Sequence, residues 1–138
     1  MSYDKILIAL SGEEDEIKVI REAFRLAEGL SATPAFLTVN NPRAGKPHMM
    51  MDTIEPVREE DIRNLIASAG FEDKSKGVDV NIVEDDTYEE EIAKWTKNID
   101  LLVMGRDQKN KFLEALITSL DEKVANIVDC PILIVPKN

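Results

Sequence analysis

The chain is short of the residues from which catalytic and metal sites are most often built. It has one cysteine, Cys130, and one histidine, His48, among 138 residues. A single cysteine excludes an intrachain disulfide and a cysteine metal cluster, and it fits a reducing compartment. A lone histidine makes a catalytic triad or a metal site an unfavoured interpretation, because such sites need several convergent groups. We expect no catalytic residues and no metal site.

Basic charge is also scarce. Lysine and arginine total 17 against 27 aspartates and glutamates, which gives a formal net charge of −10. This balance argues against a nucleic-acid partner, since phosphate binding needs clustered cations, and against attraction to anionic membranes. No apolar run approaches the roughly 20 residues of a membrane helix. The first residues lack the charged segment and long apolar core of a secretory signal. We expect a cytoplasmic protein.

What the chain does have is a regular alternation of apolar and amphipathic segments, without repeats or an interdomain linker. With 43% hydrophobic and 32% charged residues, the composition predicts one globular domain over residues 1–138. Short apolar segments predict strands, and the continuous run from Ile6 to Leu10 is typical of a strand buried on both faces. These strands are Lys5 to Leu10, Ala35 to Val39, Val78 to Ile82, Leu101 to Met104 and Ile132 to Val135.

The predicted fold class is therefore α/β: an open parallel five-stranded sheet with helices on both faces, because strands that alternate with helices form βαβ crossovers. We expect the strand order 3-2-1-4-5. Ligands of such sheets bind in the crevice where the winding reverses, here between strands 1 and 4. That order places Ser11 and Gly12 on one side of the crevice and Gly105 on the other.

Four helices are predicted between the strands. The first carries Glu13, Glu14, Asp15 and Glu16 in its first turn, where the helix dipole favours negative charge. The second starts near Glu55-Pro56 and stops at Gly70, and Phe71 to Gly77 extends it or forms a loop. Thr87 with Glu90, and Ser119 with Glu122, have the spacing of capping boxes that open the last two. The expected buried positions are Ile17, Ile20, Ala23, Phe24, Ala27, Leu30, Ile62, Leu65, Ile66, Ala69, Ile92, Trp95, Leu120, Val124, Ile127 and Val128.

Four segments together resemble the universal stress protein family, in the family's order and spacing and over nearly the whole chain. They are Ile6 to Gly12, Asp100 to Gly105, Ser119 to Val124 and Cys130 to Pro136. The resemblance implies a cytoplasmic stress-response protein and a homodimer made through the last strand, Ile132 to Val135. Unpaired backbone groups at a sheet edge give that dimer a physical reason.

The family divides into members that bind ATP and members that do not. In the ATP-binding members of the family that this chain resembles, a loop after strand 4 reads Gly, two residues, Gly, nine residues, Gly, then Ser or Thr. Gly105 matches the first glycine and Ser119 the final hydroxyl residue, whereas Gln108 and Thr118 replace the other two glycines. The family's aspartate at the end of strand 1, near the nucleotide, is Ser11 here. Val39 falls where strand 2 of the binders lies beside the adenine.

These departures predict weak or no ATP binding and no cofactor. Glycine lets a backbone approach a phosphate and adopt positive φ, whereas Gln108 has a side chain that would intrude. A β-branched residue such as Thr118 is an outlier at positive φ. Forcing the left-handed conformation costs about 1–2 kcal/mol per residue. Two such sites would weaken binding by about 10²-fold, at ~1.4 kcal/mol per decade.

The alternative function is an ATP-binding switch or slow ATPase that uses Mg²⁺. Arg106, Lys109 and Lys111 place three cations in the loop, although solvated cations that offset nearby carboxylates explain them as well. The helix beginning at Ser119 offers backbone N–H groups to an anion. On this alternative the nucleotide-binding residues are Ser11, Gly12, Val39, Gly105, Arg106, Gln108, Lys109, Thr118, Ser119 and Leu120.

Three further interpretations stay open. The Asn40 to Asp52 loop, with Met49 to Met51, suits a protein-partner surface. A two-component receiver domain has a similar length and sheet order, but Ser11-Gly12 supplies no carboxylate at the tip of strand 1. Cys130 precedes a proline at the start of a strand, which favours a packed structural thiol over a redox sensor.

Overall fold

The computed structural model describes residues 3–42, 55–106, 124 and 127–137 of the chain. Five parallel strands form one sheet: β1 (Lys5–Ala9), β2 (Thr33–Asn40), β3 (Asp79–Glu84), β4 (Leu101–Arg106) and β5 (Ile132–Pro136). Their order is β3-β2-β1-β4-β5, as the sequence predicts. The winding reverses at β1, which pairs with β2 on one side and with β4 on the other.

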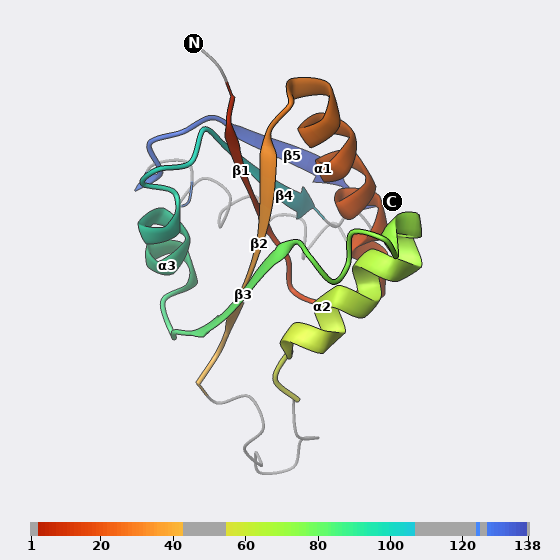
Figure 1. Cartoon of the computed structure of the whole chain (residues 1–138). Coiled ribbons are helices and arrows are strands. Elements are labelled where there is room, and N and C mark those ends of the chain that lie inside the picture. The colour runs from red at the N-terminus through yellow and green to blue at the C-terminus, as the bar shows by residue number, and fades with distance from the viewer. Residues whose placement is uncertain (1–2, 43–54, 107–123, 125–126, 138) are drawn as a thin grey trace.

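Helices cover both faces of this sheet, which confirms the predicted layers (Figure 1). On one face lie α1 (Ile17–Leu30) and α2 (Glu59–Ile66), and on the other lies α3 (Tyr88–Trp95). Alternate residues of β1 serve the two faces: Ile6 and Ile8 pack toward α1, and Leu7 and Ala9 toward α3. All four are at most 5% exposed. Burial of each large aliphatic side chain contributes about 1.5–3 kcal/mol, so the central strand anchors both cores.

The start of α2 differs from the prediction. The helix begins at Glu59, not near Glu55-Pro56. The reason lies on β2, where the Asn40 side chain accepts a hydrogen bond from the Val57 N–H (3.0 Å) and donates one to the Val57 carbonyl (2.8 Å). This clamp ties the Val57 backbone to the end of β2, so the helix begins only after it.

The end of α2 is less abrupt than a stop at Gly70. The α-helix ends at Ile66 and continues as a π turn, Ala67–Phe71, inside which Gly70 has φ of 102°. Turns follow as far as Gly77. The Arg63 guanidinium donates to the carbonyls of Ser75 and Val78, at 2.7 and 3.0 Å, and so ties these turns to α2.

The capping box predicted from Thr87 and Glu90 is wrong. Thr87 precedes α3, but its side chain makes no capping hydrogen bond and its hydroxyl lies 3.3 Å from an Asp86 carboxylate oxygen. Asp85 acts instead, because its carboxylate accepts the Thr87 N–H at 2.8 Å. The pKa of Asp85 is lowered, first by that hydrogen bond and then by one with Glu91.

Two residues predicted to be buried are exposed: Leu30 at 40% and Ile127 at 42%. Leu30 is the last residue of α1, where the chain turns through Ser31 at φ 54° toward β2. Of the last predicted helix, Val124 is buried as expected and Val128 is half-buried. Leu120 and the Ser119–Glu122 capping box lie outside the described residues. None of the helices in the described part of the chain has the length and hydrophobicity needed to cross a bilayer.

Candidate functional site

The structure places the ends of β1 and β4 side by side, where the sequence predicts a crevice. Ala9 is paired with Met104, so Ser11 and Gly12 leave β1 next to Gly105 and Arg106 at the end of β4. Arg106 is the last residue of β4, which corrects its expected place in the loop. Val39 lies one strand away, near the carboxyl end of β2, and is half-buried on the α3 face.

The remaining predicted site residues fall outside the part of the chain that the structure describes. These are Gln108, Lys109, Thr118, Ser119 and Leu120, and also His48, Met49 to Met51 and Lys111.

The turn after β1 is filled by a carboxylate that the sequence reading assigned a different role. Glu16 is 2% exposed. Its Oε1 accepts hydrogen bonds from the N–H groups of Ser11 (3.0 Å), Gly12 (2.7 Å) and Glu13 (2.9 Å), and its Oε2 a second bond from Ser11 (2.9 Å). Glu16 is therefore more than a partner of the α1 dipole.

The local fold explains why Glu16 turns inward. Glu14–Glu16 form one 3-10 turn before α1, and Glu13 and Glu16 make the reciprocal bonds of a capping box. A glutamate three residues after the helix-capping residue is the usual signal of that box. The signal is present at Glu13-x-x-Glu16. The standard pattern does not recognise this box, because the capping residue is Glu13 and not a serine or threonine.

A lysine from the end of β5 approaches the same carboxylate. The Lys137 side chain is 11% exposed, and its Nζ lies 3.7 Å from Glu13, 3.6 Å from Asp15 and 3.9 Å from Glu16. The backbone holds it in place, since the Lys137 N–H donates to the Arg106 carbonyl at 2.9 Å. Three carboxylates and one ammonium thus meet at the crevice, with a net negative charge.

Burial and polar contacts act on Glu16 in opposite directions. Loss of solvent raises the pKa of its carboxyl, and this effect exceeds the lowering by the Ser11 N–H, by Lys137 and by the other two amides. A buried carboxylate that keeps its charge needs such donors, because desolvation alone costs several kcal/mol. The amides and Lys137 therefore stabilise the Glu16 carboxylate, whereas Asp15 Oδ1 is buried with only the Lys137 ammonium, at 3.6 Å, as a charged neighbour among the described residues.

Two glycines allow this close packing. A Cβ on Gly105 would lie 2.8 Å from Val19 Cγ2 and 2.9 Å from Lys137 Cε. Gly12 has φ of 91°, and a Cβ there would lie 2.8 Å from a Val57 methyl group. Gly105, which resembles the first glycine of an ATP loop, here makes room for α1 and Lys137.

The other polar groups near the crevice form no ligand or metal site among the described residues. Arg106 Nε is buried without a hydrogen-bond partner among the described residues. Within those residues, no group of three acidic, histidine or cysteine side chains is placed to hold a metal ion. Cys130 is half-buried, and desolvation raises the pKa of its thiol, as suits a packed structural residue.

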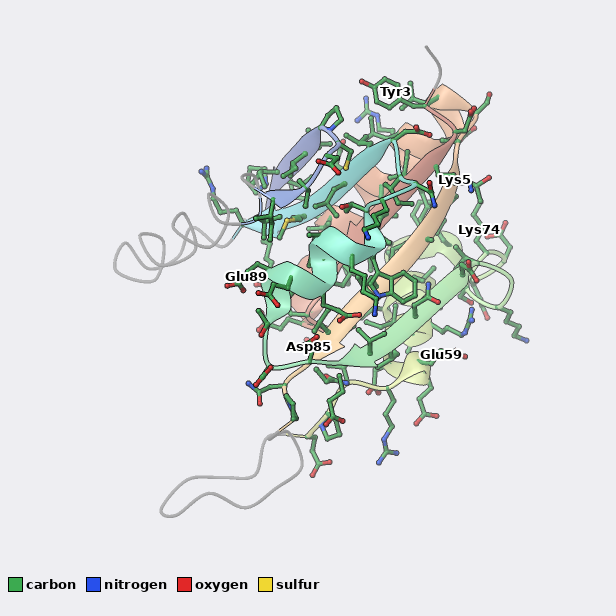
Figure 2. All side chains as sticks on the ribbon, turned by 90° about the vertical axis from the view of Figure 1, so that its left-hand side faces the viewer. Tyr3, Lys5, Glu59, Lys74, Asp85 and Glu89 are labelled. Atoms are coloured by element: carbon green, nitrogen blue, oxygen red, sulfur yellow. The ribbon has the colours of Figure 1, made fainter. Side chains whose placement is uncertain are left out.

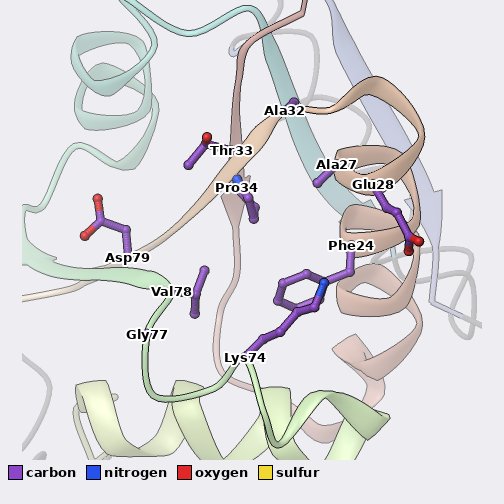
Figure 3. Close-up of a pocket in the computed structure, with 10 residues that line it drawn as sticks. All are labelled: Phe24, Ala27, Glu28, Ala32, Thr33, Pro34, Lys74, Gly77, Val78 and Asp79. Atoms are coloured by element: carbon purple, nitrogen blue, oxygen red, sulfur yellow. The ribbon is translucent and has the colours of Figure 1, made fainter.

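A hollow of about 480 Å³ lies away from the crevice, between the end of α1 and the turn that leads into β3 (Figure 3). Apolar residues form much of its lining: Phe24, Ala27, Ala32, Pro34 and Val78. The Lys74 ammonium lies 5.4 Å from the centre of the Phe24 ring. The hollow's own cation thus covers its aromatic surface.

Comparison with known proteins identifies the chain. The model of the universal stress protein family matches residues 2–136. This protein belongs to the universal stress protein family. A search of curated protein sequences found no match. The receiver-domain interpretation is thereby set aside.

Solved universal stress proteins share the fold. One, crystallised in complex with cAMP, has a TM-score of 0.72 and 16% identity, with all of both chains covered. A family protein from Burkholderia pseudomallei has a TM-score of 0.63 and 22% identity, over 97% of this chain and 96% of that one. A universal stress protein from Archaeoglobus fulgidus in complex with dAMP has a TM-score of 0.54 and 14% identity, over 98% and 99%.

Proposed function

We propose that this universal stress protein is a non-catalytic, cytoplasmic stress-response protein that binds ATP weakly or not at all. The observation that carries the proposal is the Glu16 carboxylate, which already occupies the N–H groups of Ser11, Gly12 and Glu13. Backbone N–H groups at a strand-to-helix turn are the donors that an α/β fold offers to an anionic ligand. A ligand that used these donors would have to displace Glu16.

Displacement would be costly for three reasons. The Glu16 carboxylate would lose its hydrogen bonds while buried, and a buried group left unsatisfied costs about 1–3 kcal/mol. Lys137 would lose one of its three carboxylate neighbours. The remaining carboxylates, Glu13 and Asp15, would repel phosphate oxygens at short range, where the low local dielectric strengthens the repulsion.

The loop substitutions add to this argument. Gln108 and Thr118 stand in place of two glycines of the ATP loop, and the penalty argued for them from the sequence is independent of Glu16. Mutations in the loop and at Glu16 therefore distinguish the two causes of weak ATP binding.

Nucleotide binding is the second candidate function, either with ATP and Mg²⁺ or with a smaller nucleotide. It is favoured by two fold neighbours that were solved with cAMP and with dAMP. Each of those ligands carries a single phosphate. Such a ligand would meet less repulsion from Glu13 and Asp15 than a triphosphate would.

Isothermal titration of the purified protein with ATP and Mg²⁺, and separately with cAMP, tests both candidates. We expect no ATP binding tighter than about millimolar, which corresponds to −4.1 kcal/mol. A micromolar dissociation constant for ATP would overturn the proposal. Mass spectrometry of the protein as purified should show no bound nucleotide.

Variants then locate the cause. The double variant Gln108→Gly plus Thr118→Gly should raise ATP affinity if the loop alone blocks the ligand. If it does not, Glu16→Gln should, because it removes the charge at the turn. Glu14→Gln is the matched control, since Glu14 lies in the same 3-10 turn but is exposed.

We also propose a homodimer formed through β5. In the described part of the chain β5 pairs only with β4, so its other edge is unpaired. Ile132, Leu133 and Ile134 are only half-buried. Ile127, shortly before this strand, adds an exposed apolar side chain. Short apolar edges favour pairing with a second copy, and such a contact is two-fold symmetric.

A further inference from the structure

A second hollow lies on the α3 side of the sheet, and its lining residues differ from those of the Glu16 cluster. It has a volume of about 410 Å³ and lies between α3, the residues after it and the first residue of β1. Its apolar lining comes from Val83, Trp95 and Ile99. A neighbouring hollow of about 440 Å³ shares Trp95, Ile99 and Lys5, so Trp95 borders space on more than one side.

Trp95 is the only tryptophan of the chain and is half-buried. Its Nε1–H donates to the Glu91 carboxylate one helical turn earlier, at 3.0 Å. This bond satisfies the polar edge of the indole and fixes the ring. The ring therefore offers an apolar, π-rich surface to a ligand at little entropic cost.

Three lysines surround the same hollow in a protein with net charge −10. Lys5 comes from β1, Lys94 from α3 and Lys97 from the turn that follows, and all three are exposed. In the described residues none of the three has a carboxylate within ion-pair distance, in contrast to Lys137, which has three. The dipole of α3 accounts for cations near its end, Lys94 and Lys97. Lys5 is on β1 and interacts electrostatically with Asp100, whose pKa it helps to lower.

The nearby acidic groups are already engaged. Glu91 accepts the indole N–H. Asp100 accepts the backbone N–H groups of Asp4 and Lys5, at 2.8 and 2.9 Å, which lowers the pKa of its carboxyl. Asp85 accepts the Thr87 N–H at the far end of α3. Figure 2 shows this separation, with Lys5 toward one end of the sheet and Asp85 and Glu89 toward the other.

The hollow in Figure 3 lacks this combination. There Lys74 already lies over Phe24, and Glu28 and Asp79 are the other charged residues of the lining. Beside Trp95 the three lysines have no ion pair within 4 Å among the described residues, and they outnumber the single carboxylate of the lining, Glu91.

We infer that the hollow beside Trp95 binds a small planar aromatic anion. Its ring lies against the indole and Ile99, and its carboxylate, sulfonate or phosphate faces Lys5, Lys94 and Lys97. Exposed charge pairs contribute about 0.2–1 kcal/mol each. Loss of one lysine should therefore weaken binding about two- to fivefold, and loss of all three about tenfold or more.

The test uses 2-naphthoate as the probe and its neutral analogue 2-naphthylmethanol as the reference. Because Trp95 is the only tryptophan, its indole N–H gives a single cross-peak in an ¹⁵N-correlated spectrum, which reports on this site alone. We expect 2-naphthoate to shift that peak saturably, and the neutral analogue to bind at least several-fold more weakly. Raising the salt concentration should weaken the binding of 2-naphthoate and leave the binding of 2-naphthylmethanol unchanged, because salt screens exposed charges.

The triple variant Lys5→Gln, Lys94→Gln, Lys97→Gln should weaken naphthoate binding about tenfold. Lys76→Gln is the control, since Lys76 is exposed and does not line this hollow. The inference is overturned if the indole peak does not move at millimolar 2-naphthoate, or if the alcohol binds equally well. It is also overturned if the folded triple variant, checked by circular dichroism, binds as tightly as the parent. The salt series on the parent protein decides the matter if that variant does not fold.

Discussion

The Nζ of Lys137, at the end of β5, lies 3.9 Å from a carboxylate oxygen of Glu16, at the turn after β1. These residues are 121 positions apart in the sequence, and both side chains are nearly excluded from solvent. Their contact joins the edge of the sheet to its centre at the place where α/β folds bind ligands.

Replacing Glu16 with alanine should lower the free energy of unfolding by about 1–3 kcal/mol, because the N–H groups of Ser11, Gly12 and Glu13 lose their acceptor. Urea denaturation measures the loss. Glu22→Ala is the control: Glu22 makes an ion pair with Arg25 on the surface of α1 and should change stability by less than about 0.5 kcal/mol. Equal losses in the two variants would show that the Glu16 contacts contribute nothing special.

Glu16 also predicts a pH dependence with a definite sign. Burial raises the pKa of its carboxyl in the folded state above the ordinary value of 4.5. Its contribution is therefore most favourable below 4.5, where both states are protonated, and is lost as the pH rises through the folded pKa. Relative to Glu16→Gln, the parent protein should become less stable as the pH rises from 4.5 toward neutrality. An unchanged difference over that range would contradict the prediction.

Asp100 predicts the opposite dependence. Hydrogen bonds from the N–H groups of Lys5 and Asp4 lower the pKa of its carboxyl below 3.8. The stabilisation it gives is present above 3.8 and is lost as the pH falls through the folded pKa. Asp100→Asn should therefore reduce stability at neutral pH and make it less sensitive to acid. Thermal melts between pH 2.5 and 7 compare the two proteins, and parallel curves would count against this role.

Gly105→Ala should destabilise the protein by about 1–3 kcal/mol, since the added methyl group would overlap Val19 and Lys137. Val19→Ala in the same chain should recover part of this loss, because the two sites are in contact. Gly29→Ala is the control. Among the described residues, no atom outside its chain neighbours and its own helix backbone lies within 4 Å of a Cβ at Gly29 in α1, so alanine there should stabilise by up to about 1 kcal/mol. Urea denaturation of these three variants and of Val19→Ala alone gives both the loss and the coupling.

Sedimentation at micromolar concentration should give twice the 15.5 kDa mass of the chain if β5 pairs with a second copy. Ile127→Lys should shift the protein toward monomer. Leu30→Lys should not, although Leu30 is about as exposed, at 40% against 42% for Ile127, because it lies at the end of α1. A monomer for the unmodified chain would reject the dimer, and an equal shift in both variants would reject this interface.

The sequence predicts the sheet well because each strand carries apolar residues, in a continuous run in β1 and in alternation with polar residues in β3, and because the alternation of strands with helices restricts the topology. The predicted ends of helices are wrong where a side chain distant in the sequence determines them. Asn40 holds Val57 in place and delays α2, and the two residues are 17 positions apart. The contacts of the candidate site are not predicted for the same reason, because Lys137 lies near Glu16 only when β5 is paired with β4. Local sequence patterns report the preference of a segment for helix or strand, whereas these contacts form only in the assembled fold.

The sheet also separates the phenylalanines of the described chain from its tryptophan. Phe24, Phe36 and Phe71 pack in the core with α1 and α2, whereas Trp95 packs in the core with α3. Tryptophan fluorescence therefore monitors one layer, and hydrogen exchange of the α1 amides monitors the other. If both probes give the same midpoint and slope in urea, the central strand transmits unfolding through the whole molecule, and the domain is a single cooperative unit.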